Sequence, residues 1–292
     1  MNIVQIHSGL GNQMFQYAFY LALKQNHPDT KIDTSIYRHR PSHNGYELEH
    51  IFAVEAEYAT IAERNALADV GKDWFTVFRH AIGWKRKTKV LLIIEPNPAQ
   101  GWSPELLQVD NCYLHGYWQT EKYFAHIADI IRKEFTFRHP LLDSDKELLE
   151  KIKSTNSISV HIRRGDYIKE RRRADYEVCT QTYYLRAVEF VQSHIESPTF
   201  YVFSDDPQWG QEQGIFPEGT VFVSGHIGKQ SYIDMQLMSL CNHHIIANSS
   251  FSWWGAWLGQ GEKTIVIAPR TWFKHRQRPD IIPQNWITID AE

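Results

Sequence analysis

The segment at residues 158–167 reads ISVHIRRGDY, so a predicted strand leads directly into two arginines, a glycine and an aspartate. The run at 158–162 has the length and β-branched content of a buried strand. Strand and helix patterns then alternate toward the C-terminus. Strands are expected at 199–203, 221–223, 244–247 and 264–268, and helices at 183–194, 230–241 and 252–258. This alternation predicts a parallel sheet covered by helices, in an α/β fold.

The N-terminal half opens with a related unit. Residues 2–7 read as a short strand, the glycines of 9–12 (GLGN) interrupt it, and apolar residues then recur at helical spacing. A glycine loop between a strand and a helix places backbone N–H groups where an anion or a polar ligand can bind. Further patterns follow: helices at 56–70 and 121–134, and a strand at 113–116.

A boundary between two domains is predicted near residue 150. The 292 residues correspond to two domains at roughly 150 residues each. The segment 135–156 contains a proline and a candidate helix N-cap, Asp143 or Ser144, before the regular alternation begins. We therefore expect domains at 1–152 and 153–292.

The composition excludes several classes of protein. With 42% hydrophobic and 22% charged residues, the chain as a whole is neither disordered nor of low complexity. A net charge of −3 argues against nucleic acid as the main partner. Three widely spaced cysteines form neither a disulfide framework nor a C-x-x-C metal site. We expect a cytoplasmic protein, and the basic runs 85–87 and 171–173 leave peripheral contact with an anionic membrane open.

Arg163 and Arg164 follow the predicted strand at 158–162, at the end where parallel sheets bind their ligands. Each guanidinium offers a rigid fork of donors that matches phosphate oxygens, so an arginine pair suits a diphosphate. The alternative is structural, with Arg164 and Asp166 forming an ion pair at the end of the strand.

Asp205 and Asp206 follow the strand at 199–203, so they leave the sheet on the same edge as the arginines. Three interpretations are open: the carboxylates hold a divalent metal, accept from the donors of guanine, or cap the helix that Pro207 begins. A metal site needs further ligands. The D-x-D spacing of Asp143 and Asp145 occurs where a helix cap is expected, so no metal site is predicted.

A third candidate loop follows the strand at 244–247. Asn248, Ser249, Ser250 and Phe251 lead from this strand into an aromatic helix. Small polar residues and the first N–H groups of a helix form an anion-binding end. Walker A spacing is absent, which disfavours a P-loop NTPase.

Three motifs in this order, GLGNQMFQ at 9–16, HIRRGD at 161–166 and NSSFSWW at 248–254, resemble the family 11 glycosyltransferases, the α-1,2-fucosyltransferases of bacteria and animal blood-group synthesis. The resemblance implies a GT-B fold of two facing Rossmann-like domains with parallel sheets. It implies inverting, metal-independent transfer of L-fucose from GDP-β-L-fucose to the 2-hydroxyl of a terminal β-galactoside, as in bacterial surface glycan synthesis. The first domain would hold the acceptor glycan and the second GDP-fucose, a co-substrate, with no cofactor.

The resemblance also implies roles for individual residues. Arg163 would bind the pyrophosphate with Arg164 beside it, and these arginines would act in catalysis. His161 with Asp205 or Asp206 would hold guanine and ribose. The remaining donor-binding residues would be Gly11, Asn12, Asn248, Ser249, Ser250 and Phe251.

The general base is assigned to Asp166, which is nearest in sequence to the arginines, with Glu170 and Asp175 as alternatives. No spacing pattern identifies acceptor residues. Aromatic rings pack against sugar C–H faces, although large core residues explain many of them equally well. The candidates for acceptor contact are Tyr46, Trp74, Trp84, Trp102 and Trp118.

Two other functions remain open, another nucleotide-sugar transferase and a non-catalytic carbohydrate-binding protein. The second does not need arginines and aspartates at the ends of parallel strands. GT-B chains commonly end in a helix, whereas residues 285–290 read as a short strand.

Overall fold

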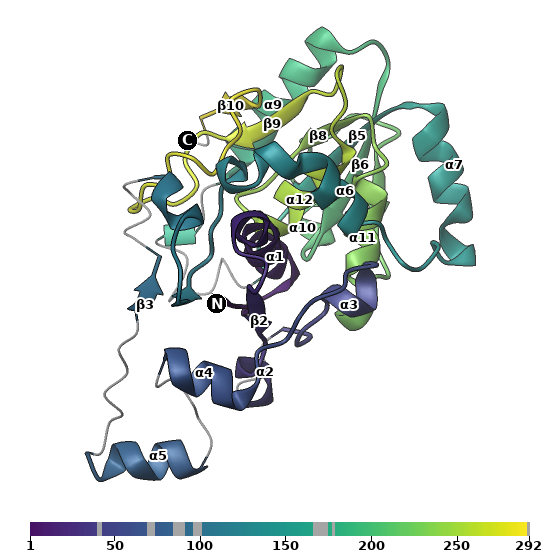
Figure 1. Ribbon diagram of the computed structural model, residues 1–292. Coiled ribbons are helices and arrows are strands. Elements are labelled where there is room, and N and C mark those ends of the chain that lie inside the picture. Colours follow the sequence, from purple (N-terminus) through teal and green to yellow (C-terminus); the bar gives the residue numbers. More distant parts are fainter. Residues whose placement is uncertain are drawn as a thin grey trace. The chain divides into compact units, whose positions relative to one another are not determined.

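The computed structural model describes residues 1–39, 43–68, 74–83, 91–95, 101–165, 175–176 and 179–290 (Figure 1). The chain divides into two compact units, Met1–Arg138 (unit 1) and His139–Glu292 (unit 2). This division lies earlier than the boundary expected between residues 152 and 153. Helix α7 (Lys146–Ser154) belongs to unit 2 because it contacts strand β5 (Asn156–Ile162) of that unit.

Unit 1 contains a four-stranded parallel sheet in the order β2-β1-β4-β3. Its strands are β1 (Ile3–Gln5), β2 (Lys31–Asp33), β3 (Leu91–Ile94) and β4 (Cys112–His115). Its helices are α1 (Leu10–Asn26), α2 (Ile36–His39), α3 (Leu48–Ile51), α4 (Ile61–Leu67), α5 (Trp74–Ala81), α6 (Ala128–Glu134) and the 3₁₀ turns η2 (Pro104–Leu107), η3 (Glu121–Tyr123) and η4 (Ala125–Ile127).

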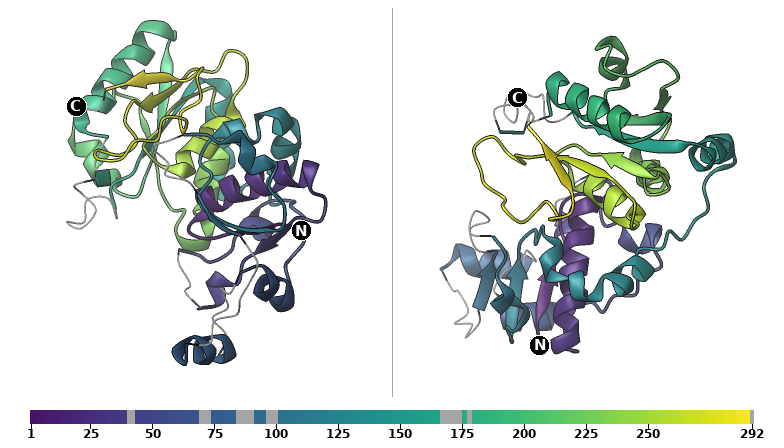
Figure 2. Two further views of the ribbon diagram at one scale, coloured as in Figure 1. Left: turned by 60° about the vertical axis from the view of Figure 1, so that its left-hand side comes forward. Right: turned by 90° about the horizontal axis from the view of Figure 1, so that it is seen from above.

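Unit 2 contains a six-stranded parallel sheet in the order β10-β9-β8-β5-β6-β7, with helices on both faces (Figure 2). Its strands are β5 (Asn156–Ile162), β6 (Pro198–Ser204), β7 (Val221–Val223), β8 (His243–Ile245), β9 (Val266–Pro269) and β10 (Ile287–Ile289). Besides α7 its helices are η5 (Asp143–Asp145), α9 (Gln181–His194), α10 (Pro207–Glu212), η6 (Gly228–Gln230), α11 (Tyr232–Met238) and α12 (Ser250–Gly259).

The strand order of unit 2 places a reversal between β5 and β8. The chain runs outward from β5 to β7, returns to β8 beside β5, and then runs outward the other way to β10. Ligands of such sheets bind outside the carboxyl ends of the strands at this reversal. The predicted α/β fold with parallel sheets is confirmed, and so is the short C-terminal strand, which pairs with β9.

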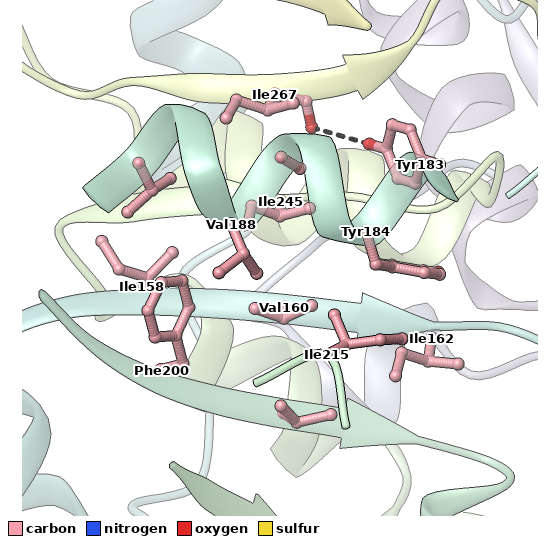
Figure 3. Packing of buried hydrophobic residues seen from close by; sticks show 13 residues of the cluster. Ile158, Val160, Ile162, Tyr183, Tyr184, Val188, Phe200, Ile215, Ile245 and Ile267 are labelled. Carbon is pink, nitrogen blue, oxygen red and sulfur yellow. Dashed lines mark hydrogen bonds between the residues drawn. The ribbon is translucent and has the colours of Figure 1, made fainter. Parts of the chain in front are cut away.

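The core of unit 2 explains why every second residue of the strand at 158–162 is apolar. Ile158, Val160 and Ile162 pack against α9, as Figure 3 shows. Each such side chain contributes about 1.5–3 kcal/mol when fully buried. The hydroxyl of Tyr183 donates to the carbonyl of Ile246 at 2.7 Å and to that of Ile267 at 3.3 Å, so its polar group is satisfied inside the core.

Three predicted helical features differ from the structure. The helix expected at 56–70 is the shorter α4, because a capping box of Thr60 and Glu63 starts it at Ile61. The helix expected at 121–134 is divided into η3, η4 and α6. The predicted N-cap at Asp143 or Ser144 is wrong, because α7 starts at Lys146 and no side chain caps it.

Candidate functional site

The candidate site lies at the carboxyl ends of β5, β6 and β8 in unit 2. The register between β5 and β6 pairs Ile162 with Ser204. The residues that follow these two, Arg163 and Asp205, therefore lie side by side although they are far apart in sequence. β8 adjoins β5 on its other side, so the loop after β8 joins the same edge of the sheet.

Two ion pairs join the loops after β5 and β6. Nη1 of Arg163 lies 2.9 Å from Oδ2 of Asp205, and Nε of Arg164 lies 3.2 Å from Oδ2 of Asp206. The backbone N–H of Arg164 also donates to Oδ1 of Asp205 at 2.8 Å. The structural alternative paired Arg164 with Asp166, which lies outside the described residues. Asp206 is the partner that the structure gives to Arg164.

The two arginines differ in their surroundings. The guanidinium of Arg164 lies over the ring of Trp209, 4.3 Å from its centroid, and its side chain is 20% exposed. The side chain of Arg163 is 32% exposed. Asp206 accepts from the N–H of Trp209 and caps α10, as one of the sequence interpretations proposed. Arg164, Asp206 and Trp209 thus form a structural cluster, and Arg163 is the more accessible cation.

Gly165 allows the two loops to approach each other. A Cβ atom at this position would lie 2.7 Å from Oδ2 of Asp205 and 3.2 Å from its Cγ. Any other residue would therefore displace the carboxylate that binds Arg163.

His161 lies on β5 directly before the arginines and is only 6% exposed. Burial lowers the pKa of its imidazole to about 4, with Asp205 raising it and Arg163 lowering it further. The ring is therefore neutral at pH 7. Its Nδ1 atom is buried and has no hydrogen-bond partner within the described part of the chain. The ring centroid of Phe251, from the third loop, is 5.8 Å away.

In the loop after β8, Asn248 organises the backbone. It is 2% exposed, and its amide donates to the carbonyls of Tyr176 and Trp272 at 3.0 Å each. Ser249 is the N-cap of α12, where its hydroxyl accepts from the N–H of Phe251. Ser250 is the first helical residue and is partly exposed. The loop therefore presents the N-terminal end of a ten-residue helix at the edge of the sheet.

The aromatic residues after this loop belong to the core. Trp253, Trp254 and Trp257 on α12 are buried, and the indole N–H of Trp253 donates to the carbonyl of Ile281 at 2.7 Å. In unit 1, Trp118 is also fully buried and stacks on Phe19 with ring centroids 4.4 Å apart. The prediction that Trp118 is a candidate for acceptor contact is wrong, because its side chain is fully buried.

The other acceptor candidates are placed as follows. Trp102 is exposed and Tyr46 is half-buried, so both remain candidates. Trp84 and the side chain of Trp74 lie outside the described residues.

The N-terminal glycine motif forms the start of α1. Gly9 is the N-cap, and the helix begins at Leu10, so Gly11 and Asn12 belong to its first turn and not to a loop. Gly11 is buried, and Oδ1 of Asn12 accepts from the amide of Gln119 at 2.7 Å.

A cluster of aromatic and histidine rings at the carboxyl ends of β1 and β4 was not predicted from the sequence. The ring of His7 stacks on that of His115 at 4.9 Å and meets the edge of Tyr117 at 4.8 Å. Burial lowers the pKa of His7 to about 4. Ser8 and Trp118 follow the two strands at φ values of 70° and 54°, and such strain clusters at functional sites. Both histidines stand at the ends of predicted strands, a signal that was available in the sequence.

Of the three candidates for the general base, the structure describes Asp175 alone. Asp166 and Glu170 lie outside the described residues, as do the basic runs 85–87 and 171–173. Asp175 binds Nε of Arg276 through Oδ2 at 2.7 Å.

No group of three or more His, Cys, Asp or Glu residues within the described ranges is arranged to hold a metal ion. Asp145, part of the D-x-D spacing, instead accepts from Nε2 of His226. Among the same residues, no helix has the length and apolar character needed to cross a membrane.

Comparison with known families identifies the chain. The sequence description of glycosyl transferase family 11 matches residues 105–290, which is more than half of the protein. The chain belongs to glycosyl transferase family 11. An alpha-1,2-colitosyltransferase of Escherichia coli is 32% identical to this family 11 glycosyltransferase, over 99% of this chain and 98% of the relative.

A further relative and a solved structure extend the comparison. A galactoside alpha-(1,2)-fucosyltransferase 1 of Saimiri boliviensis boliviensis is 28% identical, over 61% of the family 11 chain and 52% of the relative. The NodZ alpha-1,6-fucosyltransferase, solved after soaking with GDP-fucose, has 17% identity and a TM-score of 0.50, with 88% of this chain and 91% of NodZ covered. This likeness shows that the family 11 glycosyltransferase shares the GT-B fold.

Proposed function

We propose that this family 11 glycosyltransferase transfers L-fucose from GDP-β-L-fucose to the 2-hydroxyl of a terminal β-galactoside, with inversion and formation of an α-1,2 linkage. The product would be a bacterial surface glycan. The observation that carries the proposal is the position of Arg163. It is a partly exposed arginine at the carboxyl end of β5, beside the strand reversal where parallel sheets bind nucleotides.

Arg163 is assigned to the pyrophosphate. Its ion pair with Asp205 orients the guanidinium, and its planar fork matches two phosphate oxygens. The N-terminal end of α12, with Ser249 and Ser250, adds backbone N–H groups that favour the same anion. Together these groups supply the electrostatic stabilisation that other transferases obtain from a divalent metal, so we expect the reaction to need none.

His161 and Asp205 are assigned to the guanosine. His161 is neutral and keeps a buried nitrogen that forms no hydrogen bond within the described residues. Each carboxylate already accepts two bonds: Asp205 from Arg163 and the N–H of Arg164, and Asp206 from Arg164 and the N–H of Trp209. We assign Asp205 to the guanine donors because it adjoins Arg163, the arginine assigned to the pyrophosphate.

The reaction is a single displacement. The acceptor 2-hydroxyl attacks C1 of fucose from the face opposite GDP, its proton passes to a base, and the C1–O bond breaks with its electron pair on the diphosphate. Arg163 binds the charge that develops on this leaving group. Asp166 is the proposed base.

Colitose is a second candidate for the transferred sugar, favoured by the 32% identity to an alpha-1,2-colitosyltransferase. Colitose is fucose without its 3-hydroxyl group. The two donors would therefore share every contact to GDP and differ only at one position of the sugar.

The test is turnover by the purified protein with a methyl β-galactoside and each of four donors: GDP-fucose, GDP-colitose, GDP-mannose and UDP-galactose. We expect GDP release with fucose or colitose and an α-1,2 linkage in the NMR spectrum of the product. The 2-deoxy galactoside is the matched control and should remain unmodified. Binding of galactosides without release of GDP from any donor would instead support a carbohydrate-binding protein.

A further inference from the structure

Unit 1 contains a cavity of about 460 Å³ at the carboxyl end of β2, between α2 and α4. We call it the arginine cavity. Its volume lies in the range of small-ligand sites, and no step of the proposed reaction uses it. The residues that decide its chemistry are Ile32, Asp33, Arg38, Tyr58, Ile61 and Arg64.

The backbone around the arginine cavity is held by regular hydrogen bonds. The N–H of Ile32 donates to the carbonyl of Glu57 at 2.8 Å, and the N–H of Ala59 donates to the carbonyl of Ile32 at 2.9 Å. This segment therefore runs alongside β2 as an extension of the sheet. The capping box of Thr60 and Glu63 fixes the next residues at the start of α4. The cavity is preformed, so a ligand need not order its walls.

One wall suits the apolar face of a sugar. The ring of Tyr58 is 42% exposed, and its hydroxyl donates to Glu49, which holds the ring in place. Ile61, beside it at the start of α4, is also exposed. An exposed aromatic ring next to an aliphatic side chain offers a flat surface to the C–H groups of a pyranose.

The floor of the cavity holds a buried carboxylate, Asp33, and an arginine, Arg64, whose side chain is 15% exposed. Asp33 is 3% exposed and accepts from the hydroxyl of Tyr113 at 2.7 Å and the N–H of Ser35 at 2.9 Å. Nη1 of Arg64 lies 3.5 Å from Oδ1 of Asp33 and donates to the hydroxyl of Ser35. Nε of Arg64 is buried, and no hydrogen-bond partner is found for it in the described ranges.

The charges of the cavity do not balance. Arg38 is exposed at the end of α2 and forms no ion pair with any described residue. Among the residues that line the cavity, Asp33 compensates one of the two guanidinium groups, so the lining carries one excess positive charge. Glu49, which accepts from the hydroxyl of Tyr58, does not line the cavity. The carboxylates of Glu57 and Glu63 next to the cavity already bind Lys24 and Lys31, at 2.6 Å and 2.5 Å.

We propose that the arginine cavity binds an anionic sugar residue of the acceptor glycan, with its oxyanion on Arg38 and Arg64 and its C–H face on Tyr58. The proposal rests on the proposed function, because it takes the acceptor to be a glycan. A carboxylate and a phosphate monoester share the required chemistry, since both present oxygen pairs to a guanidinium fork.

Calorimetry on the full chain without donor tests the proposal with three probes: methyl β-D-glucuronide, glucose 6-phosphate and uncharged methyl β-D-glucoside. We expect one or both anionic sugars to bind about tenfold or more tightly than the uncharged one, as a charge-assisted hydrogen bond predicts. A preference for the glucuronide identifies a carboxylate ligand, and a preference for glucose 6-phosphate identifies a phosphate ligand.

Arg38→Gln should lose about tenfold in affinity for the preferred anion, while Lys133→Gln, which removes an exposed charge on α6, should bind it as the natural protein does. Arg64→Lys, measured together with a thermal melt, tests the arginine on the floor of the cavity. If this variant unfolds, the Arg38→Gln variant still tests the proposal. Equal affinity for all three probes, or unchanged affinity in Arg38→Gln, would overturn the proposal. Anion binding without any transfer from GDP-fucose or GDP-colitose would refute the proposed function and leave the assignment of the cavity unchanged.

Discussion

The two units have the same kind of sheet edge but line it with different side chains. In unit 2 the ends of β5 and β6 carry two arginines and two aspartates in ion pairs. In unit 1 the ends of β1 and β4 carry two stacked histidines and a tyrosine, and burial keeps His7 neutral. Topology therefore sets where each unit presents a ligand site, and the side chains at the strand ends set what it binds. We expect the arginines and aspartates of unit 2 to hold the nucleotide and the histidine cluster of unit 1 to contact the sugar acceptor.

The largest effect is expected at Arg163. Arg163→Lys should lower kcat by about 10²–10³ while the protein stays folded, because lysine keeps the charge but loses the bidentate fork. The measurement is kcat and KM for GDP-fucose, with a thermal melt.

Arg164→Lys is the matched control for this variant. It should show a smaller loss of rate and a larger fall in Tm, since Arg164 stacks on Trp209 and binds Asp206. Near-normal turnover by folded Arg163→Lys would remove the charged edge of unit 2 from the mechanism.

Asp205 provides the next largest test. The natural protein should bind GDP far more tightly than ADP, and Asp205→Ala should weaken GDP by about tenfold through lost contacts to guanine. Calorimetry with both nucleotides separates two roles. If Asp205 only positions Arg163, the affinities for both nucleotides will change by the same factor and their ratio will stay the same, which contradicts the guanine assignment.

The pKa of one histidine in unit 2 shifts in the direction opposite to that of His7. His226 lies between Asp234, 2.6 Å from its Nδ1, and Asp145, 3.2 Å from its Nε2. The hydrogen bond to Asp234 raises the pKa of His226. A raised pKa stabilises the fold below the unfolded value of 6.5, and this stabilisation is lost as the pH rises through the folded pKa.

His226→Gln should therefore lower the free energy of unfolding by about 1 kcal/mol at pH 6 and by less at pH 9. Chemical denaturation at both pH values measures the difference, and His194→Gln, at an exposed position, is the control. A larger loss at pH 9 would show that the cluster does not hold a charged imidazole.

The histidine cluster of unit 1 is tested at Tyr117, whose ring packs against His7. Tyr117→Ala should raise KM for the galactoside about threefold and leave KM for GDP-fucose unchanged, since a stacked ring contributes modestly to sugar binding. Initial rates with each substrate varied in turn will show it. A rise confined to KM for GDP-fucose would place the donor, not the acceptor, at this edge.

The smallest effect, none at all, is expected from removing metal ions. Excess EDTA should leave turnover unchanged, because arginines and a helix end are proposed to bind the diphosphate. A loss of activity that Mn²⁺ or Mg²⁺ restores would redirect the assignment of Asp205 and Asp206 to a metal.

Local sequence patterns were sufficient for much of the fold and for the candidate donor site. The run at 200–203, which precedes Ser204 and Asp205, is apolar on both faces, as a fully covered parallel strand requires. The run at 158–162, which precedes Arg163, carries apolar residues at every second position, on the face that packs against α9. The ends of such strands share one edge of a sheet, so the arginines and aspartates could be placed together without coordinates. The order of the three motifs was sufficient to identify the family.

Only the tertiary structure decided which of these groups bind one another and which side chains a ligand can reach. The pairing of Arg163 with Asp205 depends on the register between β5 and β6, and the burial of Trp118 depends on its packing against α1. The arginine cavity joins residues of β2, α2 and α4 that no motif connects. Register, burial and cavities arise from contacts between segments distant in the chain, whereas a sequence pattern reports only on the neighbours of each residue.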